Sequence, residues 1–185
     1  MEKLKRTFNM QTRSIDDIKD SEKVELWVEG YAVIFNSPTV IFETDSGEYK
    51  EKISEKAFEL CDMTDVIFNY NHCGKVIART RNNTLELRVD EKGLFVRARL
   101  DGTEEGRKLY DEISKGYIDR MSFQFTVSEE SYDKQSKTWT IQKVKKLYDV
   151  SAVDIPAYDE TSITARKNQI TSKARAMLQL KLKLL

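Results

Sequence analysis

The sequence predicts a mainly β domain with a few flanking helices, followed by a basic and helical C-terminal tail. Many segments alternate apolar and polar residues and are rich in β-branched and aromatic types, which is typical of strands. Helical spacing is rarer, and the composition changes near Ala165. A chain of 185 residues can bury the core of one such domain. We therefore expect a closed or nearly closed sheet within residues 1–165 and a separate tail at 166–185.

The predicted strands are the segments with the clearest alternation. Between two of them, Asp90-Glu91-Lys92-Gly93 has the composition of a hairpin turn, and residues 134–137 form another tight connection. The predicted strands cover residues 24–35, 65–70, 84–89, 94–100, 120–127, 138–143 and 147–155.

Two helices are predicted inside the domain. Over residues 103–115, Thr103 can cap the first turn, and Leu109 and Ile113 lie four positions apart on one face. A shorter helix is expected over 54–60. In the tail, residues 171–185 contain no Gly, Pro or acidic residue, and the segment from 166 onward carries basic residues alone among the charged types.

Composition argues against several functional classes. The formal net charge is zero, whereas proteins that bind nucleic acid as their main partner usually carry a basic excess. No segment has the roughly 18 consecutive apolar residues of a membrane span. Cys61 and Cys73 form no CxxC pair, and with a single histidine they make no usual zinc set, so we expect no metal and no cofactor. Two cysteines do not form a disulfide framework, which favours a reducing cytoplasm.

His72 is the only histidine and therefore the main candidate for a general base near neutral pH. It follows the apolar run 66–68, and the end of a strand is a common position for catalytic groups. A loop histidine without a role fits the same context. Cys73 is a competing nucleophile, but neighbouring side chains on an extended segment point to opposite faces, which makes a dyad with His72 geometrically poor.

Ser122 and Asp149 have the residue types that would complete a triad with His72. Ser122 lies on the polar face of a predicted strand with large apolar neighbours, which suits a nucleophile and equally suits any polar strand face. Asp149 lies in an apolar segment, where a carboxylate requires a partner. That partner could be His72, or a basic side chain such as Arg120. In the triad reading, Arg120 or backbone amides would stabilise an oxyanion.

The order of several short motifs resembles the prohead protease family of tailed phages, a serine peptidase family related in fold to herpesvirus assemblin. The resemblance extends from Gly30 to Arg166. Two family glycines are replaced, by Ala78 and by Gln124, and Gln124 places a long side chain near the nucleophile. The matching segments are residues 30–36, 51–58, 71–79, 109–125 and 149–158.

The resemblance implies a β-barrel surrounded by helices, with His72 as catalytic histidine, Ser122 as nucleophile and Asp149 in place of the commoner glutamate. It also implies an endopeptidase located inside the immature capsid, in the host cytoplasm. There it would cut the scaffold, or the scaffold-like N-terminal segment of the major capsid protein, and also itself. A homodimer would be consistent with the assemblin relationship. Two other hypotheses stay open: a non-catalytic assembly or scaffolding protein that keeps the protease fold, and an unrelated β-barrel binding module.

Overall fold

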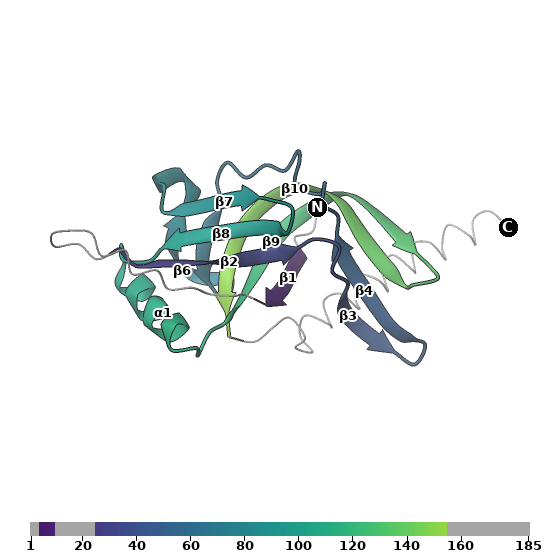
Figure 1. Cartoon of the computed structure of the whole chain (residues 1–185), viewed down its shortest axis with the longest axis horizontal. Coiled ribbons are helices and arrows are strands. Elements are labelled where there is room, and N and C mark those ends of the chain that lie inside the picture. Colours follow the sequence, from purple (N-terminus) through teal and green to yellow (C-terminus); the bar gives the residue numbers. More distant parts are fainter. Residues whose placement is uncertain (1–3, 10–24, 155–185) are drawn as a thin grey trace.

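The computed structural model describes residues 4–9 and 25–154, and these residues form mostly β-structure (Figure 1). One α-helix and one short 3₁₀ helix accompany the strands in this part of the chain. The mainly β prediction is therefore confirmed. The elements are β1 (Leu4–Asn9), β2 (Trp27–Ile34), β3 (Thr39–Thr44), β4 (Gly47–Ile53), β5 (Ile67–Tyr70), β6 (Cys73–Arg79), η1 (Thr80–Asn82), β7 (Leu85–Val89), β8 (Gly93–Arg99), α1 (Glu104–Ser114), β9 (Arg120–Asp133) and β10 (Thr138–Val153).

The strands form two sheets. The larger has the order β1-β9-β10-β4-β3, and β10 also pairs with β5, which in turn pairs with β6. The smaller has the order β2-β8-β7. Within the larger sheet, β10 runs antiparallel to β9 and parallel to both β4 and β5. Strand β10 is therefore the element that joins the parts of this sheet.

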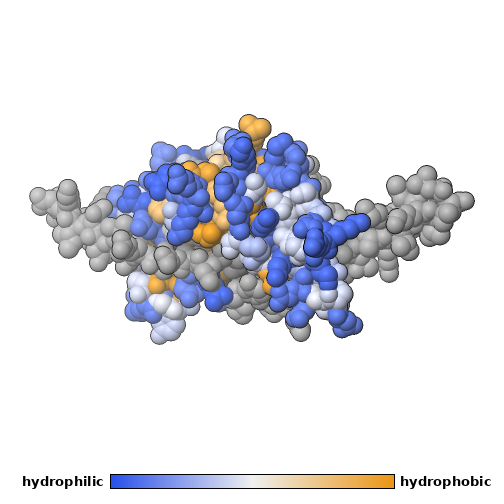
Figure 2. All heavy atoms as spheres, turned by 45° about the vertical axis from the view of Figure 1, so that its right-hand side comes forward, coloured by the Kyte–Doolittle hydropathy of each residue, from blue (hydrophilic) through white to orange (hydrophobic). Residues whose placement is uncertain are grey.

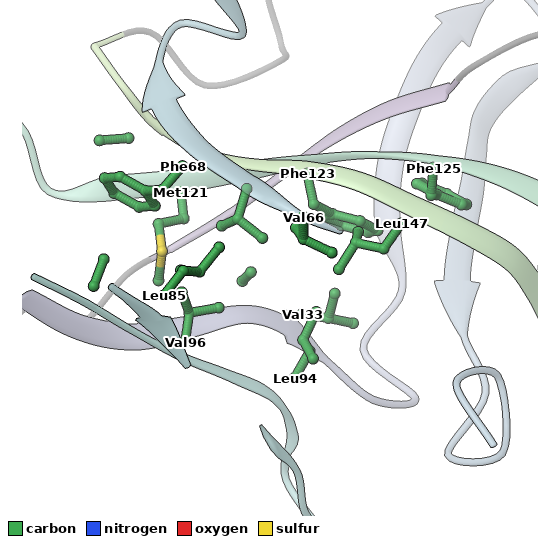
Figure 3. Packing of buried hydrophobic residues seen from close by; sticks show 14 of the residues in the cluster. Val33, Val66, Phe68, Leu85, Leu94, Val96, Met121, Phe123, Phe125 and Leu147 are labelled. Atoms are coloured by element: carbon green, nitrogen blue, oxygen red, sulfur yellow. The ribbon is translucent and has the colours of Figure 1, made fainter. Parts of the chain in front are cut away.

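The core lies between the two sheets, where apolar side chains from both point toward one another (Figure 3). Met121, Phe123 and Phe125 of β9 are on this face and at most 1% exposed. Val96 of β8 and Leu85 of β7 approach from the smaller sheet (Figure 3). Because alternate residues of a strand point to opposite faces, Ser122 and Gln124 lie on the other face of the larger sheet.

Strand β10 covers two predicted strands, 138–143 and 147–155. The prediction that they are separate strands is wrong. Of the intervening residues, Val144 and Lys146 stay paired with β9, and the register shifts at several points along this pairing. Such shifts mark β-bulges, which let a long strand bend without ending. β9 continues to Asp133, and the hairpin that it forms with β10 extends toward the same side of the molecule as the β3–β4 hairpin (Figure 1).

One predicted helix is confirmed and one is wrong. Helix α1 begins after Thr103, whose hydroxyl accepts a hydrogen bond from the backbone N–H of Gly106, and it buries Leu109 and Ile113. Residues 54–60 form successive turns instead of a helix. Their backbone bonds span three residues, as from Ala57 N to Ser54 O, so no α-helical ladder develops.

The face seen in Figure 2 is predominantly hydrophilic, with smaller apolar areas between charged side chains. None of the helices found in residues 4–9 and 25–154 is long and apolar enough to cross a membrane. The predicted tail at 166–185 and the proposed domain end near Ala165 lie outside the described residues.

Candidate active site

Two rows of side chains cross the larger sheet on neighbouring strands β9, β10 and β5. Phe123, Val150 and Phe68 are paired across the strands and form an apolar row on the core face. One residue along, Ser122 is opposite Ser151, and Ser151 is opposite Asn69. Directly paired residues share a face of the sheet, so these three polar residues form a second row on the face away from the core.

A β-bulge brings Asp149 to this polar face. Leu147 pairs with Phe125 on the core face, and the next registered pair is Asp149 with Gln124, so Tyr148 is the extra residue on β10. In a regular strand, Leu147 and Asp149 would point the same way. The extra residue reverses the alternation, because a shift by one residue moves each following side chain to the other face. Asp149 thus shares a face with Ser122 and Ser151.

His72 is positioned by a tight turn between β5 and β6. Tyr70 pairs with Cys73 across these strands, and the two residues between them, Asn71 and His72, have φ values of 50° and 57°. Positive φ at both central positions is the pattern of a type I′ hairpin turn. The Asn71 N–H also donates to the carbonyl of Ala152 on β10, at 2.9 Å. This bond ties the turn to the strand that carries Asp149.

The turn places the imidazole directly against the carboxylate. His72 Nδ1 lies 2.5 Å from Asp149 Oδ1, and the two side chains are only 7% and 6% exposed. A carboxylate that is ionised can only accept hydrogen bonds, which assigns His72 Nδ1–H as the donor and Asp149 Oδ1 as the acceptor of this bond. His72 therefore is the partner that the buried Asp149 requires, and Arg120 does not have that role.

This tautomer leaves Nε2 of His72 as the nitrogen that can accept a proton. Nε2 is buried and has no hydrogen-bond partner within the part of the chain that the structure describes. Ser122 is 2% exposed and lies opposite Ser151, whose hydroxyl is 3.1 Å from His72 Nδ1. The structure thus joins His72 directly to Asp149 and places Ser122 on the neighbouring strand, opposite Ser151, which contacts both members of this pair.

Arg120 and Gln124 flank Ser122 on β9, and alternation puts all three on one face. Gln124 is opposite Asp149, and Arg120 is opposite Val153 at the end of the ladder. The guanidinium Nε of Arg120 is 3.6 Å from Asp119 Oδ1, and its side chain is 34% exposed. Both residues therefore border the polar row.

Comparisons with known proteins identify the family of the chain. The model of the caudovirus prohead serine proteases matches residues 8–176. The chain belongs to this family. The solved structure of the bacteriophage T4 capsid assembly protease is similar in fold, with a TM-score of 0.52 and 15% identity over 84% of this chain and 98% of that one. No curated protein matches the chain.

The prohead serine proteases form a serine peptidase family, and the other candidate nucleophile, Cys73, is poorly placed in this member. Cys73 is exposed, and its Sγ donates a hydrogen bond to the carbonyl of Tyr70 at 3.5 Å. Residues 4–9 and 25–154 contain no cluster of three His, Cys, Asp or Glu side chains that could hold a metal ion.

Sequence reasoning missed two members of the polar row in this prohead protease, Ser151 and Asn69. Both are buried, and the Ser151 hydroxyl contacts His72, Asp149 and Asn69 together. A serine two residues after Asp149 is expected on the same strand face, which is the signal that could have indicated Ser151. Asn69 carries no such signal, because its position opposite Ser151 depends on the parallel pairing of β5 with β10.

Proposed function

We propose that this chain is an active serine endopeptidase of capsid maturation, with Ser122 as nucleophile, His72 as general base and Asp149 as the group that orients His72. The observation that carries the proposal is the 2.5 Å contact between His72 Nδ1 and Asp149 Oδ1. That contact leaves Nε2, the nitrogen that must take the serine proton, without a partner among the described residues. Membership of a serine peptidase family supports the same assignment.

The proposed reaction uses these three residues in turn. Ser122 Oγ attacks the carbonyl carbon of the scissile peptide bond, and its proton passes to Nε2 of His72. The imidazolium that forms is stabilised by the carboxylate of Asp149 at Nδ1. His72 then gives the proton to the leaving amine as the C–N bond breaks. Water hydrolyses the acyl-enzyme by the same route and restores Ser122.

The negative oxygen of the tetrahedral intermediate requires hydrogen-bond donors. Arg120 supports this role as a cation two residues from Ser122 on the same strand face. Backbone N–H groups are the alternative donors. Gln124, opposite Asp149, is proposed to border the substrate groove, where its amide would contact the peptide close to the reacting bond.

The proposed substrate is the scaffold protein or a scaffold-like N-terminal segment of the major capsid protein of the same virus, inside the immature capsid. Self-cleavage near the basic segment 166–185 is part of the proposal, because that segment follows the proposed domain end near Ala165. The T4 protein of similar fold is described as a capsid assembly protease, which supports this class of substrate.

Co-expression with the capsid and scaffold proteins of the same virus tests the proposal. The unaltered chain should produce a new N-terminus on one of them, identified by mass spectrometry, and the Ser122→Ala variant should not. Ser128→Ala is a matched control, because Ser128 is also on β9 but its hydroxyl donates to the Lys143 carbonyl away from the site. Equal cleavage by Ser122→Ala would contradict the proposal. Capsid assembly without any cleavage by the unaltered chain would favour a non-catalytic assembly protein.

A further inference from the structure

Ser151 is the most deeply buried polar residue next to the His72–Asp149 pair. It is 0% exposed and follows Asp149 by two residues on β10, so both side chains point to the same face. Its Oγ lies 2.9 Å from Asp149 Oδ1 and 3.1 Å from His72 Nδ1. It also donates a hydrogen bond to Oδ1 of Asn69, on the neighbouring strand β5. The hydroxyl is therefore in contact with both members of the pair.

The Ser151 hydroxyl can donate only one of these hydrogen bonds. A serine hydroxyl has one proton and two lone pairs, and the carboxylate and amide oxygens can only accept. Asn69 Oδ1 is the nearer of the two acceptors, so it receives the proton of Ser151. A lone pair of Ser151 Oγ then faces Nδ1 of His72. Two acceptors, Asp149 Oδ1 and Ser151 Oγ, therefore surround the Nδ1 proton.

We propose that Ser151 is a positioning residue for His72, held in its acceptor orientation by Asn69. By favouring the proton on Nδ1, it keeps Nε2 unprotonated and ready to accept the proton of Ser122. Asn69 is 4% exposed and paired with Ser151 in the ladder, so the orientation is built into the sheet. The effect of Ser151 on catalysis rests on the proposed function. Its effect on which nitrogen of His72 carries the proton does not.

The single histidine of the chain permits a direct test. In protein labelled with ¹⁵N-histidine, the two ring nitrogen shifts report which nitrogen carries the proton. The unaltered protein should show the Nδ1–H form at neutral pH, and Ser151→Ala should show a larger share of the Nε2–H form. Ser151→Thr, which keeps the hydroxyl, should restore the original spectrum. Ser128→Ala should leave the spectrum unchanged.

Kinetics on a capsid-derived peptide complete the test. Ser151→Ala should lower kcat by on the order of 10-fold to 100-fold with little change in KM, as expected when a group that orients a catalytic residue is lost. Ser151→Thr should recover part of this loss. If the unaltered protein cuts no peptide but Ser151→Ala still changes the tautomer, the proposed function fails and the positioning role of Ser151 stands.

Three results would overturn the inference. The first is a Ser151→Ala protein that keeps both the Nδ1–H spectrum and the original kcat. The second is a fluorophosphonate adduct on Ser151 instead of Ser122, because Ser151 would then be the nucleophile. Should Ser151→Ala fail to fold, Asn69→Ala serves as the second variant. It should shift the tautomer in the same direction, and an unchanged ring spectrum in that variant would also overturn the inference.

Discussion

His72 occupies a backbone conformation that side chains with a Cβ atom rarely adopt. Its φ of 57° lies in the left-handed region, at the second central position of a two-residue turn where glycine is usually preferred. The cost for a residue other than glycine is about 1 kcal/mol. The turn thus accepts strain at the residue that the proposed mechanism needs, which is a common property of functional sites.

This strain predicts a difference in stability between two variants that lack the imidazole. His72→Gly and His72→Ala both remove the imidazole, but glycine adopts the left-handed conformation without the Cβ penalty. The glycine variant should therefore be more stable than the alanine variant by about 1 kcal/mol. Urea unfolding followed by fluorescence measures the difference. Equal stabilities, or a more stable alanine variant, would show that the turn is not strained in this way.

The two cysteines should differ strongly in reactivity. Burial of Cys61 raises the pKa of its thiol to about 11, and the thiolate is the reactive form, whereas Cys73 is exposed. At about pH 8, a disulfide reagent such as DTNB should modify Cys73 rapidly in the native protein and Cys61 only after unfolding. Cys73→Ser should remove the fast reaction and keep peptidase activity. Loss of activity in that variant would instead indicate a cysteine nucleophile.

At the scale of elements, the segment before β5 is fastened to β10 just ahead of the bulge. Asp62 accepts a hydrogen bond from Lys146 Nζ at 2.9 Å, and backbone bonds link Asp62 to Lys145 and Leu147. The Lys146 ammonium and the hydroxyl and N–H of Thr64 hold the pKa of the Asp62 carboxyl well below its usual range. This link is adjacent to the β-bulge that places Asp149 on the polar face.

Asp62 should therefore contribute to acid sensitivity. Because its pKa is lower in the folded state, its stabilising effect is present above the unfolded value of 3.8 and is lost as the pH falls through the folded value. Between about pH 5 and pH 3, Asp62→Asn should lose less stability than the unaltered protein. Thermal unfolding at a series of pH values measures this. The same acid dependence in both proteins would exclude Asp62 as a contributor.

Most of the longer strands and α1 could be predicted because their signals are local, whereas β1, β3, β4 and β6 were not predicted. Alternation identified most of the larger strands, and Thr103 with Leu109 and Ile113 identified the helix. The bulge at Tyr148 could not be predicted, since it depends on the register with β9. From the sequence, Asp149 follows Leu147 by two positions, so the two should share a face. Only the observed pairing places the carboxylate on the polar side.

At the scale of the whole molecule, the two faces of the larger sheet carry different kinds of side chain. Its core face packs Phe123 and its neighbours against the smaller sheet, as Figure 3 shows, and this packing fixes the positions of β9, β10 and β5. Its opposite face carries the polar row one residue along the same strands. Residues from distant parts of the chain are therefore held close together on rigid, packed strands. Such a support suits a site that must keep its functional groups in place.

His72, Ser122 and Asp149 could be selected from the sequence as residue types and by family resemblance, but the direct contact between His72 and Asp149 could not be predicted. The position of the His72 side chain depends on a turn with two positive φ values. The sequence Asn71-His72 indicates such a turn less clearly than Asn-Gly would. The contacts of Ser151 with both His72 and Asp149 depend on the order β9-β10-β5. That order includes a parallel pairing between segments about 80 residues apart, which local patterns do not encode.

Covalent labelling tests the central claim most directly. A fluorophosphonate that reacts with activated serines should modify the native protein at Ser122, as located by tandem mass spectrometry. The adduct should be absent from Ser122→Ala and strongly reduced in His72→Gly, because in the proposed mechanism His72 activates the hydroxyl by accepting its proton. An adduct at another residue, or equal labelling of Ser122 without His72, would contradict the assignment of Ser122 and His72 as the catalytic pair.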